Sequence, residues 1–569
     1  MNKKIIIKTL EKIALYMELQ GENPFKVSAF RKAAAALEAD ERSLNEIDDV
    51  TKLKGIGKGT ASVILELMES GQSSVLAELE AAVPKGLVPL MKIPGLGGKK
   101  LAKLYQELNI VDAESLKAAC EAGKVRELAG FAAKTEEKIL KELEAFGTRQ
   151  ERLPIWQLEP VVLEINALLE GLAAVQKFSV AGSFRRVSES SKDVDFIIAT
   201  EDVATVREAI LTKLGVLETV AAGDTKVSVI LDRDEPVSVD FRMVKLEEYA
   251  TALHHFTGSK DHNIRMRQIA KEQGKKISEY GVEQPDGTVA TFESEEAFFA
   301  HFDLPFIPPT VRENGKELER LDELAGLATL ADIKADLHMH TTWSDGAHSV
   351  VEMGQALMEL GYTHAVITDH SQYLKVANGL TPERLQNQKN DIYEFNAANP
   401  SFTLYRGTEM DILPDGTLDF DDEVLRDLDF VIASIHSSFT QPVETIMERL
   451  HNAISNPYVH MIAHPTGRII GKRSGYEVNM PQLIEWAAQY DKILELNANP
   501  YRLDLCVEYL QMAMERNVKV AINTDAHAID QLRFMDIGIK YSQKAWLKKE
   551  LIVNTWTQDE FEAFIRKNK

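Results

Sequence analysis

Residues 182–195 read GSFRRVSESSKDVD, and this stretch decides how the middle of the chain is interpreted. Side chains alternate along a strand, so Asp193 and Asp195 would lie on one face. Two adjacent carboxylates repel each other unless a cation neutralises them, which divalent metals do well. A third carboxylate, Asp240, lies in the strand-like run VSVDF at 237–241. Three converging aspartates suit a two-metal site for phosphoryl transfer, whereas an isolated Asp-x-Asp pair is more simply a solvated strand edge.

The residues around these aspartates offer donors to a triphosphate. Gly182 and Ser183 supply backbone and hydroxyl groups, and Arg186 supplies a cation. The whole set, continued by FTGS at 256–259 and by Asn263 and Arg267, resembles the family X DNA polymerases of the DNA polymerase beta kind.

This resemblance extends over roughly residues 1–315 and implies a palm and a thumb. It implies that Asp193, Asp195 and Asp240 are catalytic and bind two Mg or Mn ions. It implies that Arg267 lies near the template and that dNTP contacts come from Gly182, Ser183, Arg186, Ser191, Phe256, Gly258, Ser259 and Asn263. His255 stands where the family usually has Tyr beside the sugar, which leaves sugar discrimination at this position open.

Two glycine motifs precede helical patterns in the N-terminal region. They read LKGIGKG at 53–59 and IPGLGGKK at 93–100. Glycines permit a tight turn and leave backbone N–H groups free to hold a phosphate at a helix N-terminus. The two motifs resemble helix-hairpin-helix motifs, which bind DNA backbones, although ordinary glycine turns between helices are the simpler alternative. The expected DNA contacts are Gly55, Gly57, Lys58, Gly95, Gly97 and Lys99.

The same resemblance assigns a role to the small domain at the N-terminus. Lys26 and Arg31 match positions that bind the 5′-phosphate of a gap. The lysine that forms a Schiff base in lyase-competent relatives aligns with Val63. Valine cannot form an imine, so lyase chemistry through this position is not expected.

From Ala335 onward, short apolar runs end repeatedly in metal-ligand residues. Six such runs, and a seventh at 493–497 without an obvious ligand, alternate with helical stretches, which predicts repeated β-α units. The carboxyl ends of parallel barrel strands converge on one mouth, so their side chains would meet there. The candidate ligands are six histidines and three carboxylates: His338, His340, Asp345, His370, Glu409, His436, His464, Asp525 and His527.

This arrangement resembles the PHP (polymerase and histidinol phosphatase) domain, a distorted seven-stranded barrel with a trinuclear site. All nine ligand positions are occupied by suitable residues, which implies about three Mn or Zn ions. Arg468 and Lys472 follow His464 closely and would either steady a DNA phosphate or lie on a solvated loop.

The two halves together resemble the bacterial and archaeal family X polymerases that carry a C-terminal PHP domain. The predicted fold is multidomain, α+β and α/β. Its divisions are a helical helix-hairpin-helix domain at 1–90, a fingers-like helical domain at 91–152, a palm at 153–245, a thumb-like domain at 246–315, a helical linker at 316–334 and a distorted (β/α)7 PHP barrel at 335–569.

The resemblance implies short-gap filling in DNA repair, with a 3′-5′ exonuclease in the PHP barrel. The expected partners are dNTPs and DNA, as gapped or primer-template duplexes and 3′ ends, and the chain is expected to be a monomer. Three alternatives stay open. The barrel could be a phosphomonoesterase or a structural metal domain, or the palm could be a DNA-binding module beside an active nuclease.

Composition agrees with a protein of the cytoplasm. Two cysteines, Cys120 and Cys506, exclude a disulfide framework. No apolar run is long enough to predict a membrane span, and the first residues do not predict a signal peptide. The net charge of −23 does not exclude DNA binding, because only the local patch matters at a phosphate backbone.

Overall fold

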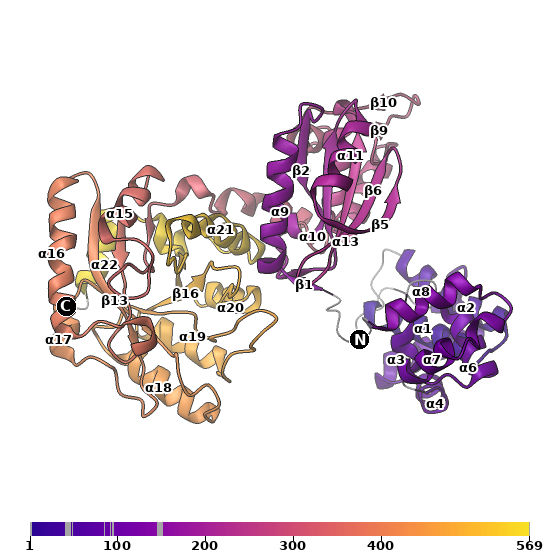
Figure 1. Cartoon of the computed structure of the whole chain (residues 1–569), viewed down its shortest axis with the longest axis horizontal. Coiled ribbons are helices and arrows are strands. Elements are labelled where there is room, and N and C mark those ends of the chain that lie inside the picture. Colours follow the sequence, from indigo (N-terminus) through magenta and orange to yellow (C-terminus); the bar gives the residue numbers. More distant parts are fainter. Residues whose placement is uncertain are drawn as a thin grey trace. The chain divides into compact units, whose positions relative to one another are not determined.

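The computed structural model describes residues 3–39, 47, 49–84, 86–91, 93, 96–144 and 152–567, and it forms two compact units, Met1–Gln150 and Glu151–Lys569 (Figure 1). Among the described residues, no helix has the length and apolar character needed to cross a bilayer.

The first unit is helical around one hydrophobic core that draws on residues from Ile6 to Leu143. Its helices are α1 (Lys3–Leu19), α2 (Pro24–Ala39), α3 (Lys58–Ser70), α4 (Ser74–Ala82), α5 (Leu87–Leu90), α6 (Gly98–Leu108), α7 (Ala113–Glu121) and α8 (Ala133–Glu144). The glycine motifs lie directly before α3 and α6, so the expected divisions at 1–90 and 91–152 share this core.

The second unit begins with a five-stranded sheet in the order β2-β4-β7-β6-β5. The strands are β2 (Lys177–Val180), β4 (Val194–Ala199), β5 (Val216–Ala222), β6 (Lys226–Leu231) and β7 (Val237–Val244), with helices α9 (Ile155–Glu170) and α11 (Val203–Lys213). The hydrophobic core of the sheet includes apolar residues of both helices. Strands β4 and β7 run parallel, which places Asp195 and Asp240 in register.

A mixed subdomain follows, built from α12 (Tyr249–Thr257), α13 (Lys260–Glu272), α14 (Glu295–Ala300) and a sheet of β8 (Lys276–Ile277), β9 (Val282–Glu283) and β10 (Val289–Ala290). Residues 316–334 were expected to be a helical linker. They instead contain short 3-10 turns, Lys316–Glu319, Leu321–Gly326 and Leu330–Asp332. The segment packs on the C-terminal part, because the guanidinium of Arg320 lies 4.1 Å from the ring centroid of Trp546.

The C-terminal part is a barrel of seven parallel strands in sequential order, as predicted. They are β11 (Ala335–Asp336), β12 (His364–Ile367), β13 (Thr403–Asp411), β14 (Phe430–Ser434), β15 (Met461–Ile462), β16 (Ile493–Asn497) and β17 (Lys519–Asn523). A single bridge between Met339 and Ala526 connects the two ends of the sheet. The two-residue strands β11 and β15 make the barrel irregular.

Helices surround this barrel (Figure 1). They are α15 (Val350–Glu359), α16 (Pro382–Ala398), α17 (Asp422–Asp427), α18 (Val443–Ser455), α19 (Met480–Gln489), α20 (Val507–Glu515), α21 (Phe534–Lys544) and α22 (Gln558–Lys567). Buried apolar side chains of the helices and strands form one large core cluster. Such βα repeats place every strand's carboxyl end at the same mouth.

The five-stranded sheet and the barrel touch each other within the second unit. The rings of Trp156 on α9 and Tyr501 after β16 stack with centroids 4.5 Å apart. The Trp156 indole donates to the Ile470 carbonyl over 2.9 Å, and Arg533 pairs with Glu159 at 3.1 Å. The two parts therefore form one compact body.

Candidate active sites

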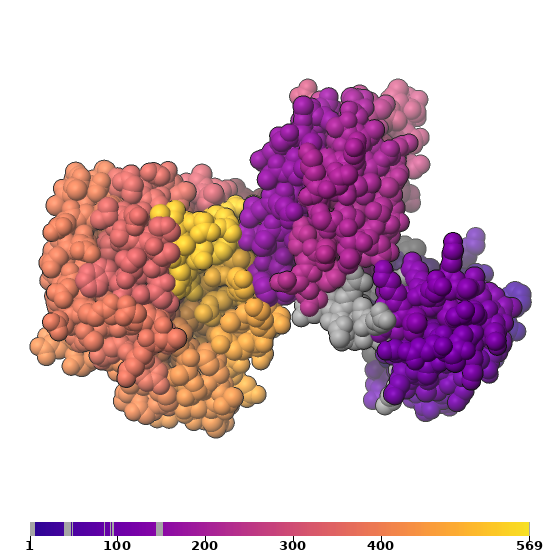
Figure 2. Space-filling view, in the orientation of Figure 1, coloured from indigo at the N-terminus to yellow at the C-terminus, as the bar shows by residue number. Residues whose placement is uncertain are grey.

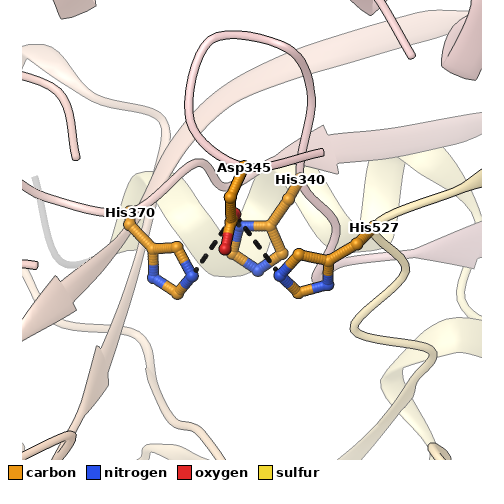
Figure 3. Close-up of side chains that lie close together, drawn as sticks. All are labelled: His340, Asp345, His370 and His527. Carbon is orange, nitrogen blue, oxygen red and sulfur yellow. Dashed lines mark ion pairs between the residues drawn. The ribbon is translucent and has the colours of Figure 1, made fainter. Parts of the chain in front are cut away.

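The mouth of the barrel brings all nine candidate ligands together. Three overlapping groups place one ligand atom of each member within 4.8 Å of the others. The groups are His340, Asp345, His370 and His527; His338, His340, Glu409 and Asp525; and His370, Glu409 and His436. Figure 3 shows the first group, in which Asp345 Oδ1 lies 3.4 Å from His527 Nε2 and 3.7 Å from His370 Nε2.

Glu409 is the centre of the cluster. It lies within β13 and is buried. One carboxylate oxygen lies 3.0 to 3.4 Å from ring nitrogens of His338, His340 and His370. The other lies 3.2 Å from His436 Nε2 and 2.9 Å from His464 Nε2, which brings the ninth ligand into the cluster. A carboxylate in this position is suited to bridging two metal ions.

The chemistry of the donor set fits divalent metals. Three ring nitrogens that face carboxylates of the cluster, Nε2 of His338 and Nδ1 of His340 and His370, are buried without a hydrogen-bond partner, as expected of atoms reserved for a metal. Burial, together with the charges of His527 and His370, lowers the pKa of His340 to about 3 and keeps its imidazole neutral. Neutral imidazole with carboxylate is a ligand set suited to Zn or Mn.

Two buried carboxylates outside the predicted set orient ligands. Glu495 Oε1 lies 2.7 Å from His338 Nδ1, and Glu495 Oε2 accepts from the His464 backbone N–H at 2.7 Å. Asp411 lies 3.2 Å from His436 Nδ1. Such partners fix ring orientation and tautomer. Glu495 is a lone acid within an apolar strand, and Asp411 is two residues beyond Glu409, on the same strand face; these were the available sequence signals.

The palm aspartates crowd one another at the end of the five-stranded sheet. Burial first, and then the charges of Asp193 and Asp240, raise the pKa of Asp195 to about 7. Asp240 lies 2.7 Å from Lys226 Nζ and accepts from Ser228 Oγ at 2.6 Å. Crowded carboxylates of this kind are relieved by divalent cations, so the residues present fit the expected two-metal site.

The segment from Gly182 to Ser191 is called the nucleotide loop here. It comprises α10 (Gly182–Arg185), a turn and β3 (Ser190–Ser191). The hydroxyls of Ser183 and Ser191 are hydrogen-bonded, and Ser191 also donates to the Asp193 carbonyl at 2.7 Å. Gly182 has φ +62°, and a Cβ there would lie 2.3 Å from an Asp195 oxygen. Only glycine therefore allows the loop to approach the aspartates this closely.

The remaining nucleotide candidates lie at the junction of α12 and α13. Arg186 Nη1 donates to the Thr257 carbonyl at 2.5 Å, which connects the nucleotide loop to Phe256, Gly258 and Ser259. Ser259 caps α13 by accepting from the His262 N–H. Asn263 Nδ2 donates to the His255 carbonyl at 2.7 Å, and Arg267 lies one turn further along α13.

The glycine motifs of the first unit have equivalent geometry. Gly57 and Gly97 are the extended N-cap residues of α3 and α6, with ψ of 171° and 169°. A Cβ at either position would meet no atom within 4 Å, so packing does not require glycine there. Lys58 and Lys99 lie in the first turns, and Gly55 has φ +112°. Gly95 lies outside the described residues.

Lys26 and Arg31 both lie on α2 of the first unit and are called the α2 cations. Each of them pairs with a carboxylate. Lys26 Nζ is 3.1 Å from Glu22, and Arg31 Nη2 is 2.6 Å from Glu18. Both side chains are more than half exposed, so a stronger anion can compete for them. Val63 is buried on α3, within the helical core.

Arg468 and Lys472 differ in their surroundings: the Arg468 side chain is largely buried, whereas Lys472 lies on an exposed stretch of loop at 471–474. Arg468 lies 2.9 Å from Glu189 of the nucleotide loop and donates to the Arg502 carbonyl at 2.9 Å. Lys472 Nζ lies 4.3 Å from the ring centroid of Trp156. Both cations therefore contribute to the contact between the palm and the barrel, which the sequence did not indicate.

Family models match four parts of the chain. A helix-hairpin-helix domain matches residues 1–73, and a SAM-like helix-hairpin-helix tandem matches 47–109 and 87–145. A DNA polymerase beta thumb matches 252–313, and a PHP domain matches 336–500. This order, with the fold above, defines a family X DNA polymerase fused to a C-terminal PHP domain.

Whole-chain similarity identifies the family. The chain is 56% identical over 569 residues, 100% of both proteins, to the DNA polymerase/3′-5′ exonuclease PolX of Bacillus subtilis (strain 168), and it belongs to the PolX family. Other relatives match a smaller part of the chain. A probable phosphatase of Acetivibrio thermocellus is 28% identical over 249 residues, 41% of this chain and 95% of the relative. One of Caldanaerobacter subterraneus subsp. tengcongensis is 27% identical over 239 residues, 39% of this chain and 86% of the relative.

Proposed function

We propose that this chain is a DNA-directed DNA polymerase that fills short gaps during DNA repair and trims 3′ ends with a 3′-5′ exonuclease in its barrel. The observation that carries the proposal is the pairing of two sites in one chain: three aspartates at the end of the palm sheet and nine ligands at the barrel mouth. The whole-length similarity to a polymerase/exonuclease supports the same pairing.

Each site has a defined set of ions and ligands in this proposal. Asp193, Asp195 and Asp240 hold two Mg or Mn ions, which supply charge neutralisation for phosphoryl transfer. The nine barrel residues hold about three Mn or Zn ions. The nucleotide loop and the α12–α13 junction receive the dNTP, and Arg267 contacts the template.

The first unit completes the substrate site. The helix N-termini at Gly57 and Gly97 hold DNA phosphates through backbone N–H groups, since open space lies in front of both glycines. The α2 cations receive the 5′-phosphate of a gap. We assign domains at 1–90, 91–152, 153–245, 246–315 and 335–569, joined by the linker at 316–334, in a monomeric protein of the cytoplasm.

One gapped, 5′-phosphorylated duplex tests both activities. With dNTPs and Mg or Mn, the primer should lengthen to fill the gap; without dNTPs, its 3′ end should shorten. If the primer is extended neither in Mg nor in Mn, the polymerase assignment is refuted. If its 3′ end is not shortened, the nuclease assignment is refuted.

A second candidate function for the barrel is hydrolysis of a small phosphomonoester. It is favoured by the similarity of about two fifths of the chain to proteins named probable phosphatases. The hydrolysis rates of a single-stranded oligonucleotide and of a small phosphomonoester, measured in the same metal, discriminate the two. Faster hydrolysis of the monoester would replace the exonuclease proposal.

A further inference from the structure

The nucleotide loop is fixed from the barrel side as well as by the palm. Its turn, Arg186 to Glu189, connects Ser183 to Ser191, whose hydroxyls are hydrogen-bonded to each other and must both face the triphosphate in the proposed function. The Ser188 N–H donates to the Ser183 carbonyl at 3.0 Å, so the turn determines how the two ends approach each other. Contacts that fix this turn therefore also fix the hydroxyl donors of Ser183 and Ser191.

Val187, at the centre of this turn, adopts a conformation that its side chain disfavours. Its φ is +53°, a region that β-branched residues rarely occupy. Its side chain is buried within the same hydrophobic cluster as the barrel core. Packing contacts must stabilise such a conformation. Most of the apolar residues in the cluster that contains Val187 belong to the barrel.

Glu189, the next charged residue of the turn, is held by two barrel side chains. Arg468 lies 2.9 Å away, and the Tyr541 hydroxyl donates to the same carboxylate. Arg468 is itself fixed by the carbonyls of Arg502 and Leu503. Arg468 and Tyr541 are largely buried whereas the Glu189 side chain is 36% exposed, so solvent screens this contact only in part.

Lys544 provides a second attachment, one turn beyond Tyr541 on α21. Its ammonium group donates to the Arg186 carbonyl at 3.4 Å and forms an ion pair with Glu313. Glu313 in turn lies 3.4 Å from Arg186 Nε and accepts through its backbone from Ser259 Oγ at 2.7 Å. One barrel lysine thus connects residues on both sides of the proposed dNTP site. Figure 2 shows the C-terminal segment, in yellow, lying against the palm.

We propose that Arg468, Tyr541 and Lys544 of the barrel are positioning residues for the polymerase site: they set the nucleotide loop so that Ser183 and Arg186 meet the triphosphate of an incoming dNTP. The inference rests on the proposed polymerase function. It makes the barrel a structural part of the nucleotide site, independently of the barrel's own hydrolysis.

The domain contact does not depend on these three residues alone. The stack of Trp156 on Tyr501 and the pair of Arg533 with Glu159 hold the palm and barrel at other points. Removal of a loop contact should therefore change the loop without separating the two parts.

The test compares Lys544→Met and Tyr541→Phe in the full-length chain. Single-nucleotide extension of a gapped duplex gives KM and kcat for the dNTP. We expect KM to rise about tenfold in Lys544→Met and about threefold in Tyr541→Phe, with kcat and DNA affinity within twofold. Lys544→Arg should restore most of the affinity. Lys540→Met, on the exposed side of the same helix and paired only with Asp536, is the matched control and should not change KM.

Hydrolysis of 3′ ends, measured without dNTPs, should stay within twofold in every variant. Unchanged dNTP KM in both Lys544→Met and Tyr541→Phe would overturn the positioning role while leaving the polymerase assignment intact. Absence of extension by the unaltered chain would instead refute the proposed function itself. If Lys544→Met loses both activities through misfolding, detected by circular dichroism, Tyr541→Phe decides, because phenylalanine preserves the packing.

Discussion

Replacement of Glu495 by glutamine should weaken metal binding in the barrel without altering the ligands. Glu495 is fully buried and accepts four hydrogen bonds. His338 Nδ1 at 2.7 Å and Asn523 Nδ2 at 3.0 Å meet one oxygen. The His464 N–H at 2.7 Å and Asn497 Nδ2 at 3.3 Å meet the other. Whichever way the glutamine amide lies, two of these donors face an NH2 group.

The size of the effect follows from this geometry. An unsatisfied buried donor costs about 1 to 3 kcal/mol, and the remaining bonds lose their charged acceptor. Loss of a carboxylate that orients a ligand typically weakens metal affinity about 10- to 100-fold. This range corresponds to about 1.4 to 2.8 kcal/mol. Because the backbone of His464 and the ring of His338 are both affected, we expect a value near the upper end.

The assay measures the metal content of the purified chain and its Mn affinity by competition with a chelator. Hydrolysis of 3′ ends should fall at limiting Mn and recover at saturating Mn, while primer extension in Mg stays unchanged. Glu485→Gln, an exposed barrel position paired with Arg516, is the matched control. Unchanged metal content and Mn affinity in Glu495→Gln would refute the orienting role.

The remaining predictions concern the two chemistries and the small N-terminal domain. Alanine at Asp193 and Asp195 should abolish extension and preserve 3′ hydrolysis, whereas alanine at His338 and His340 should do the reverse; a well-folded palm variant without exonuclease would contradict the two-site model. Because Val63 replaces the Schiff-base lysine, borohydride should trap no covalent adduct on a lysine of residues 1–90, and an adduct would show that another lysine serves. The chain should bind gaps with a 5′-phosphate more tightly than gaps without one, and alanine at one of the α2 cations should reduce the salt slope of binding by about one unit; equal binding to both gaps would refute the assignment.

The barrel could be predicted from the sequence because its ligands occur at recognisable positions relative to the short apolar runs. Most of them follow or end an apolar run, and parallel strands bring such positions to one mouth, so a one-dimensional pattern predicts a three-dimensional cluster. Glu495 and Asp411 escaped this pattern because Glu495 lies in the middle of β16, Asp411 comes two residues after the ligand Glu409 on β13, and both contact ligand side chains. Their roles depend on which ring nitrogen each partner presents, which no spacing reveals. The linker was misjudged for a related reason: its helical composition did not show that packing would divide it into 3-10 turns.

The contact between palm and barrel could not be predicted, because Glu189 lies 279 residues from Arg468 and 352 from Tyr541. Neither partner carries a local signal of its role. This contact determines how a truncation should be interpreted. A chain without residues 335–569 would lose Arg468, Tyr541 and Lys544 together and would expose Val187, whose left-handed conformation then lacks its apolar support. Loss of polymerisation in that truncation would not mean that the barrel metals act in polymerisation. Point substitutions separate the two explanations, since alanine at His338 and His340 removes metal ligands, whereas Lys544→Met removes only support for the nucleotide loop.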